Sequence, residues 1–307
     1  MDATRASLTA LATSLMRAIH TRLDRPALID DPWGNRLVSE EERESLSLAA
    51  EAGLDPADAE RVAALATLSE RVDAALRLHP AYPTIIARTR YAEDALAEAV
   101  ALGARQYVIV GAGMDSFALR QPDFARELEI FEVDHPATQE FKRRRLHDLG
   151  VALPDRLHFV AADLSAEALG SALERSSFSG DELSFFAWLG VTSYLTREAN
   201  LATLREIASC SLPASELVFT YIDQREFEPE SASPETRRIR AGVEAAGEPW
   251  VSGFIPALLA DELRAVGMTL IEDLGGDDLR SRYCADRSDN LHPARYLHVA
   301  RARVVVK

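Results

Sequence analysis

Residues 107–115 read Tyr-Val-Ile-Val-Gly-Ala-Gly-Met-Asp, and this stretch decides the fold that we expect for the chain. The aromatic and β-branched run predicts a buried strand, and a glycine turn then leads into a helical segment. Glycine at positions 111 and 113 lets backbone N–H groups approach a ligand closely, and the helix N-terminus adds a positive end. A full dinucleotide fingerprint would require glycine where the chain has Ser116. The stretch therefore predicts a nucleotide-type site without strong support for a pyrophosphate.

Carboxylates end the next two predicted strands. Asp134 lies 23 residues after Gly111, close to the offset of roughly 20 expected for an acid that binds ribose hydroxyls. Asp163, followed by Leu164, ends the third strand at the same edge, where it could accept from an adenine amino group. Asp163 could equally serve as an N-cap of the following helix. Together these residues predict an adenosine site.

Short β-branched runs alternate with amphipathic segments after Gly103, which is typical of crossover-linked parallel strands. The residues before it are helical in pattern. We expect a helical N-terminal cap over 1–103 and an α/β core over 104–307, with a lid-like insertion at 225–251. The predicted strands span 106–110, 129–133, 157–161, 183–188, 216–221, 269–274 and 296–305. The predicted core helices span 116–126, 136–149, 166–175, 197–211 and 256–266.

Composition narrows the range of functions. The 34 basic and 49 acidic residues give a net charge of −15, which removes the main driving force for nucleic-acid or anionic-lipid binding. The run of one lysine and three arginines at 142–145 is interpreted as a helix face with charge partners. Two cysteines and no metal-ligand spacing predict neither a disulfide framework nor a metal site. No export signal or membrane span is visible, so a cytoplasmic location is expected.

Several motifs together resemble the class I S-adenosylmethionine-dependent methyltransferases, and more narrowly the leucine carboxyl methyltransferase family with its bacterial polyketide-tailoring O-methyltransferase relatives. The carriers of the resemblance are Leu28-Ile29-Asp30-Asp31-Pro32-Trp33, Arg88-Thr89-Arg90-Tyr91 with Asp94, Val110-Gly111-Ala112-Gly113-Met114-Asp115-Ser116, Phe131-Glu132-Val133-Asp134-His135-Pro136, Ala162-Asp163-Leu164, and Gly190-Val191-Thr192-Ser193-Tyr194-Leu195. The resemblance implies a seven-stranded, mostly parallel Rossmann-like sheet with helices on both faces and a helical N-terminal cap.

The resemblance also implies roles for individual residues. The glycine turn would line the methionine moiety of the cofactor, Asp134 would hold the ribose, and Asp163 with Leu164 would frame the adenine. A guanidinium would hold the cofactor carboxylate as a planar fork; Arg88 is the first choice and Arg90 the competing one. The predicted cofactor-binding residues are Arg88, Gly111, Ala112, Gly113, Asp115, Asp134, His135, Asp163, Leu164 and Leu189. Leu189 departs from the family pattern, because a glutamate commonly precedes the glycine there.

Methyl transfer from a sulfonium is an in-line displacement in which the protein chiefly aligns the reacting atoms. An ionised carboxylate acceptor needs no general base, and no histidine stands in a motif suited to one. This favours an O-methyltransferase that acts on a carboxylate of a small molecule or peptide, with S-adenosyl-L-methionine as cofactor and S-adenosyl-L-homocysteine as product. Tyr194 and Tyr221, near the ends of the fourth and fifth strands, are the candidates to contact the acceptor.

Two alternatives stay open at this point. One is hydroxyl O-methylation of a natural product. The other is a methyltransferase-like scaffold that binds the cofactor without transferring a methyl group, which the Leu189 departure leaves open.

Overall fold

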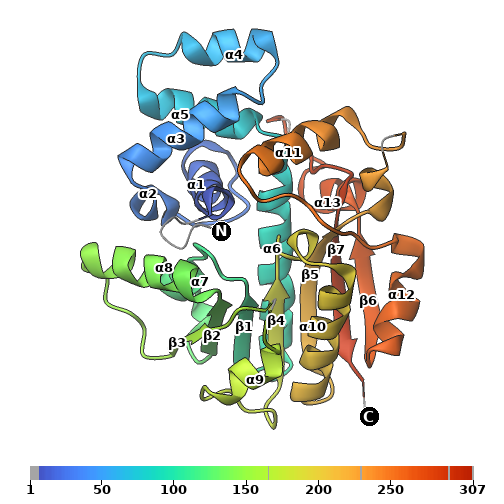
Figure 1. The fold of residues 1–307 in the computed structure, drawn as a ribbon. Coiled ribbons are helices and arrows are strands. Elements are labelled where there is room, and N and C mark those ends of the chain that lie inside the picture. The colour runs from blue at the N-terminus through green and yellow to red at the C-terminus, as the bar shows by residue number, and fades with distance from the viewer. Residues whose placement is uncertain (1–6, 165, 229, 290, 306–307) are drawn as a thin grey trace.

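A computed structural model describes residues 7–164, 166–228, 230–289 and 291–305, and its centre is one seven-stranded sheet (Figure 1). The order of the strands is β3-β2-β1-β4-β5-β7-β6. All neighbours from β3 to β5 pair in parallel, and β7 runs antiparallel to both β5 and β6. The strands are β1 (Gln106–Val110), β2 (Glu129–Asp134), β3 (Leu157–Ala161), β4 (Ser184–Trp188), β5 (Glu216–Ile222), β6 (Met268–Leu274) and β7 (Leu297–Val304).

The helices divide along the chain into a group over residues 8–78 and a group over residues 81–283. The first group is α1 (Leu8–Leu23), α2 (Gly34–Leu37), α3 (Glu40–Glu51), α4 (Pro56–Ala63) and α5 (Leu68–Leu78). The second group is α6 (Ala81–Ala101), α7 (Phe117–Arg120), α8 (Pro136–Asp148), α9 (Leu169–Glu174), α10 (Arg197–Cys210), α11 (Pro234–Ala245), α12 (Pro256–Ala265) and α13 (Gly276–Tyr283). The remaining elements among the described residues are the 3-10 turns η1 (Asp123–Ala125), η2 (Thr192–Tyr194) and η3 (Gln224–Phe227).

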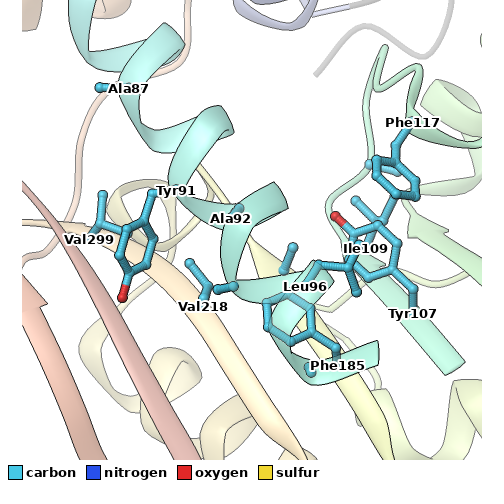
Figure 2. Packing of buried hydrophobic residues seen from close by; sticks show 14 of the residues in the cluster. Ala87, Tyr91, Ala92, Leu96, Tyr107, Ile109, Phe117, Phe185, Val218 and Val299 are labelled. Atoms are coloured by element: carbon cyan, nitrogen blue, oxygen red, sulfur yellow. The ribbon is translucent and has the colours of Figure 1, made fainter. Parts of the chain in front are cut away.

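The two faces of the sheet are both covered, as parallel strands require. On one face α6 lies across the strands, with Tyr91 and Leu96 packed in the same cluster as Ile109, Phe185 and Val218 (Figure 2). On the other face α9, α10 and α12 pack against a second apolar cluster. The predicted fold class is confirmed by this architecture.

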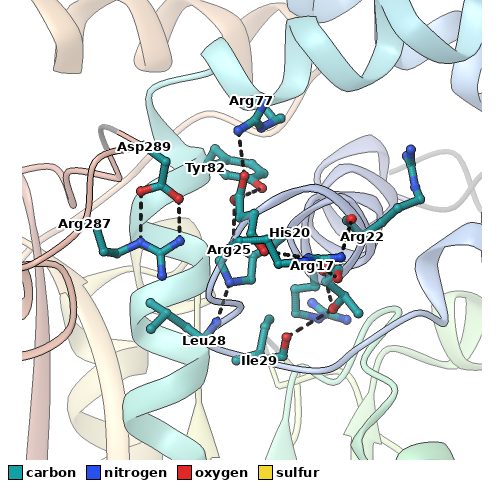
Figure 3. A network of polar contacts seen from close by, with 12 residues as sticks. Arg17, His20, Arg22, Arg25, Leu28, Ile29, Arg77, Tyr82, Arg287 and Asp289 are labelled. Atoms are coloured by element: carbon teal, nitrogen blue, oxygen red, sulfur yellow. Dashed lines mark hydrogen bonds and ion pairs between the residues drawn. The ribbon is translucent and has the colours of Figure 1, made fainter.

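Helices α1 to α5 gather beyond the carboxyl ends of the parallel strands (Figure 1). A buried polar network ties the end of α1 to α5 and α6 (Figure 3). Its centre is Asp24, which accepts from Arg77 at 2.6 Å and from the Tyr82 hydroxyl at 2.7 Å, and which lies 2.7 Å from the His20 ring. The division of the chain at residue 103 stays a prediction, and α6, on its N-terminal side, packs against the sheet.

Most predicted elements agree with the structure to within a few residues, but the helix predicted over 116–126 is wrong. The helix ends at Arg120, because Gln121 adopts a left-handed backbone with φ of 44° and Pro122 follows. The predicted insertion at 225–251 contains the helix α11.

No helix among the described residues combines the length and apolar character needed to cross a bilayer.

Candidate functional site

The carboxyl edge of the sheet brings together the acidic residues that the sequence predicted for adenosine. Asp134 at the end of β2 is in register with Ala161 at the end of β3, and the Ala162 N–H donates to the Asp134 carbonyl at 2.8 Å. Asp163 follows directly. The glycine turn leaves β1, which is the neighbour of β2 on its other side. These three strand ends therefore form one continuous rim.

Asp134 is held by two backbone amides. One carboxylate oxygen accepts from the Gly113 N–H, and the other accepts from the His135 N–H at 2.6 Å. Burial raises the pKa of Asp134, and the two amide hydrogen bonds oppose that rise. Each carboxylate oxygen can accept a second hydrogen bond, so the carboxylate is oriented and still able to accept from hydroxyl groups.

The glycines of the turn permit close approach of other chain segments. Gly111 and Gly113 have φ of 72° and 51°, which disfavours any residue with a side chain. A Cβ at Gly111 would collide with the Val191 side chain, and one at Gly113 would lie 3.2 Å from the Ala10 Cβ. The turn is thus packed between the loop after β4 and helix α1.

The turn's own amides are used within the protein. Gly111 and Ala112 N–H donate to the Val133 carbonyl at 2.8 and 3.1 Å. The side chain of Asp115 accepts from the Phe117 N–H at 2.7 Å and begins α7. The glycines therefore serve the turn through their positive φ and through the room that they leave for Val191 and Ala10.

Arg88 lies on α6 with its guanidinium against Gly190, the first turn residue after Leu189. A Cβ at Gly190 would be 2.8 Å from both terminal nitrogens of Arg88. Burial lowers the pKa of Arg88 to about 10, and no ion pair or hydrogen bond of its side chain occurs among the residues that the structure describes. Arg90, the competing choice, is exposed and pairs with Asp94 at 2.7 Å. The structure thus favours Arg88 as the cation available to a ligand.

Aromatic side chains surround Arg88. Tyr194, in η2, is half-buried; burial raises its pKa, and hydrogen bonds with Trp250 and Thr9 oppose the rise. Tyr296 is buried just before β7, and its ring centroid lies 5.5 Å from that of Trp250. Trp250 and Tyr296 were not predicted as site residues. The antiparallel pairing of β7 with β5 brings Tyr296 to this edge, and the Val251 N–H, which donates to the Ser193 carbonyl at 2.6 Å, holds the segment of Trp250 beside η2.

Tyr221 lies elsewhere. Its side chain is buried in the cluster on the α10 and α12 face, its hydroxyl donates to Asp273 at 2.7 Å, and its ring stacks on His298. The structure therefore does not bring Tyr221 together with Tyr194 and Arg88.

The other predicted residues lie on the rim. The His135 ring accepts from the Ala137 N–H at 3.2 Å and caps α8. The Asp163 carbonyl accepts from the Ala166 and Glu167 amides. Leu164 packs on the α9 side, and Leu189 packs on the α6 side of the sheet. Within the described ranges no group of three histidine, cysteine or acidic side chains could hold a metal ion.

A cleft of about 400 Å³ lies apart from this rim. It is lined by the 28–33 loop, α6 and α7, and contains Arg90 but not Arg88. Two of its charged side chains, Glu93 and Arg120, pair with each other at 2.6 Å.

The sheet order with its antiparallel β7, together with acidic ends on β2 and β3, defines a class I methyltransferase fold. The sequence model of the leucine carboxyl methyltransferase family matches residues 10–208, and the chain belongs to that family. The predicted resemblance is thereby confirmed.

Curated relatives are named as S-adenosyl-L-methionine-dependent methyltransferases. The chain is 33% identical over 296 residues to a Bacillus subtilis (strain 168) protein named "Putative S-adenosyl-L-methionine-dependent methyltransferase YktD", covering 96% of this chain and 97% of that one. It is 34% identical over 223 residues to a Mycolicibacterium smegmatis protein of the same description, covering 73% and 69%. The names of both relatives contain S-adenosyl-L-methionine, the cofactor that the sequence predicts. The predicted cofactor is thereby confirmed.

Among solved structures, a DUF574 family protein from Streptomyces avermitilis MA-4680 is similar with a TM-score of 0.56. The match covers 88% of this chain and 99% of that one at 14% sequence identity, so it supports the fold alone.

Proposed function

We propose that this protein is an S-adenosyl-L-methionine-dependent O-methyltransferase that methylates a carboxylate of a small molecule or peptide. The observation that carries the proposal is Arg88, a guanidinium without an anionic partner among the described residues, placed at the same sheet edge as Asp134 and Asp163.

The residues at this edge fit the cofactor. A half-buried cation that lacks a carboxylate partner is costly unless a ligand supplies one, and Arg88 would bind the amino-acid carboxylate. Asp134 would accept from the ribose hydroxyls, and Asp163 with Leu164 would border the adenine. When bound, the cofactor supplies an electrophilic methyl group on its sulfonium. The residues of this chain would align the acceptor with the methyl group and exclude water from the site.

A carboxylate acceptor agrees with the side chains around Arg88. An ionised carboxylate attacks without losing a proton, so the site needs no general base. Tyr194 and Tyr296 are poor bases, because burial raises the pKa of both phenols. We assign Tyr194 to hydrogen-bond the acceptor. We leave Tyr221 out of the acceptor site, because its side chain is buried in the apolar cluster on the α10 and α12 face of the sheet.

One observation favours the alternative of a hydroxyl acceptor. Glu235 lies in the first turn of α11 within the 225–251 insertion, and burial raises its pKa. Burial raises the pKa of Tyr296, and the charge of Glu235 adds to that rise. A carboxylate with a raised pKa is a suitable general base for an alcohol or phenol.

The test has two stages. Calorimetric titration of the protein should show binding of S-adenosylmethionine and S-adenosylhomocysteine and no binding of NAD. Binding of NAD without binding of the two S-adenosyl compounds would refute the proposal. Methyl-labelled cofactor is then incubated with a panel of carboxylic acids, peptides and phenols. Label released as methanol by mild alkali identifies an ester, and an alkali-stable product identifies an ether.

Two controls complete the experiment. Asp134→Ala should remove both binding and transfer. Cofactor binding without transfer to any member of the panel would support the binding-scaffold alternative.

A further inference from the structure

Two successive carbonyl oxygens of the glycine turn are held by buried cations from different helices. The Met114 carbonyl accepts from the Arg17 guanidinium of α1 at 3.1 Å. The Asp115 carbonyl accepts from the Lys142 ammonium of α8 at 2.6 Å. Arg17 is 5% exposed and Lys142 is 1% exposed. Neither residue belongs to the cofactor-binding set proposed above.

Each cation has its own buried carboxylate. Arg17 donates to Asp31 at 2.7 Å, and Asp31 also accepts from the Ser116 hydroxyl at 2.6 Å. Lys142 donates to Glu132 of β2 at 2.5 Å. We call these four side chains, Arg17 with Asp31 and Lys142 with Glu132, the carbonyl clamp. Arg17 and the residues of α1 near it are visible in Figure 3.

Stability alone does not account for the carbonyl clamp. Burying an ion pair removes water from both charges, and the attraction between the charges only partly offsets that cost. Well-packed apolar residues in place of a buried ion pair often give a fold of equal stability. One oxygen of Glu132 has no hydrogen-bond partner in the part of the chain that the structure describes, and burial raises the pKa of this carboxyl group to about 7. The ion pairs also fix the orientation of the turn, because each cation donates to one of its carbonyl groups.

The consequence reaches Asp134 through the backbone. In a trans peptide the carbonyl and the next N–H point in opposite directions, so holding the Met114 carbonyl directs the Asp115 N–H. That N–H donates to the Ala112 carbonyl at 2.8 Å and closes the turn. The closed turn aims the Gly113 N–H at the Asp134 carboxylate.

We infer that the carbonyl clamp is a positioning device for the cofactor site: Arg17 and Lys142 hold the glycine turn so that Gly113 orients Asp134 toward the ribose. The inference rests on the proposed function, because it assumes that Asp134 binds the ribose. The clamp also joins the N-terminal cap to the sheet at the turn, since Arg17 comes from α1 and Lys142 from α8.

The test removes one ion pair without leaving a lone buried charge. The double variant Glu132→Gln/Lys142→Met keeps the size of both side chains, and its dissociation constant for S-adenosylhomocysteine is measured by calorimetry. We expect the constant to rise about tenfold, equivalent to ~1.4 kcal/mol, while the free energy of unfolding in urea changes little. Arg17→Met/Asp31→Asn tests the other half in the same way, should the first variant fold poorly.

The matched control lies on the same helix. Arg145 of α8 pairs with Glu42 at 2.7 Å and donates to the Leu37 carbonyl at 2.5 Å, so it makes the same kinds of contact, directed at the cap. Glu42→Gln/Arg145→Met should leave the dissociation constant within about twofold of the wild-type value.

A second ligand separates positioning from general damage. 5′-Methylthioadenosine keeps the ribose and adenine but lacks the amino-acid tail. Because the clamp acts through Asp134, the variant should lose the same factor of affinity for this ligand as for S-adenosylhomocysteine. Unchanged affinity for both ligands, or a loss confined to S-adenosylhomocysteine, would overturn the inference. Failure of the wild-type protein to bind either ligand would instead refute the proposed function.

Discussion

Replacing Arg88 with methionine should strengthen the ligand-free fold and weaken the cofactor complex at the same time. Burial lowers the pKa of Arg88 to about 10, from an ordinary value of about 12.5. A basic group whose pKa is lower in the folded than in the unfolded protein destabilises the fold at every pH at which it is charged in both states, and this includes neutral pH. The cost disappears only as the pH rises above about 10. At 1.36 kcal/mol for each pKa unit, the cost is at most about 3 kcal/mol.

The expected gain is smaller than this limit. The Arg88 side chain is partly exposed, and water screens part of its charge. We therefore expect Arg88→Met to raise the free energy of unfolding of the ligand-free protein by about 1–2 kcal/mol at pH 7. The loss of a charge-assisted contact should weaken S-adenosylhomocysteine binding by about 2–3 kcal/mol, or about 30- to 150-fold.

Urea unfolding and calorimetric titration measure the two effects separately. Arg90→Met is the matched control, because Arg90 is two residues away on the same helix, exposed and paired with Asp94. Its removal should change neither quantity by more than about 1 kcal/mol. A less stable Arg88→Met protein that binds S-adenosylhomocysteine as tightly as the wild type would refute the assignment of Arg88.

Three further predictions concern the rim and the cap. Asp134→Asn should weaken S-adenosylhomocysteine binding by about 1.5–3 kcal/mol in calorimetry, because the charged acceptor for the ribose hydroxyls is lost; unchanged affinity would remove Asp134 from this role. The Asp31 pKa is lowered, because Arg17 and other partners outweigh the opposing effect of burial. Asp31 therefore stabilises the fold above about pH 4 and loses that effect below it. Asp31→Asn should accordingly be less stable than wild type in urea at pH 7, with a smaller difference at pH 3.5; a constant difference contradicts the ion pair. Gly111→Ala should lower the free energy of unfolding by about 2–4 kcal/mol, because φ is 72° and a Cβ would collide with Val191. A melting temperature equal to that of the wild type would show that the turn can accommodate a side chain at this position.

The sequence predicts the sheet well because its signals are local. Short apolar runs rich in aromatic and β-branched residues predicted the bounds of β1 and β3 as the structure has them, and glycine or a carboxylate followed the strand ends. The helix predicted over 116–126 failed where Pro122 and a left-handed Gln121 interrupt it. The apolar pattern continues across that interruption, so periodicity alone overextends the helix.

The site is less well predicted wherever distant segments meet. Asp134 and Asp163 follow from parallel strands alone, and they share one edge. Tyr221 was chosen because it is near a strand end, but its partner Asp273 belongs to β6, which reaches it across the antiparallel β7. Arg17 and Lys142 carry no motif of their own. Their contacts with the turn depend on how α1 and α8 pack, which no short spacing encodes.

A crystal structure of the complex with S-adenosylhomocysteine tests the central claim most directly. The account predicts ribose hydroxyls within hydrogen-bond distance of the Asp134 carboxylate, adenine beside Asp163 and Leu164, and the amino-acid carboxylate on the Arg88 guanidinium. Adenosine bound away from the ends of β2 and β3, for example in the cleft between the 28–33 loop, α6 and α7, would contradict it.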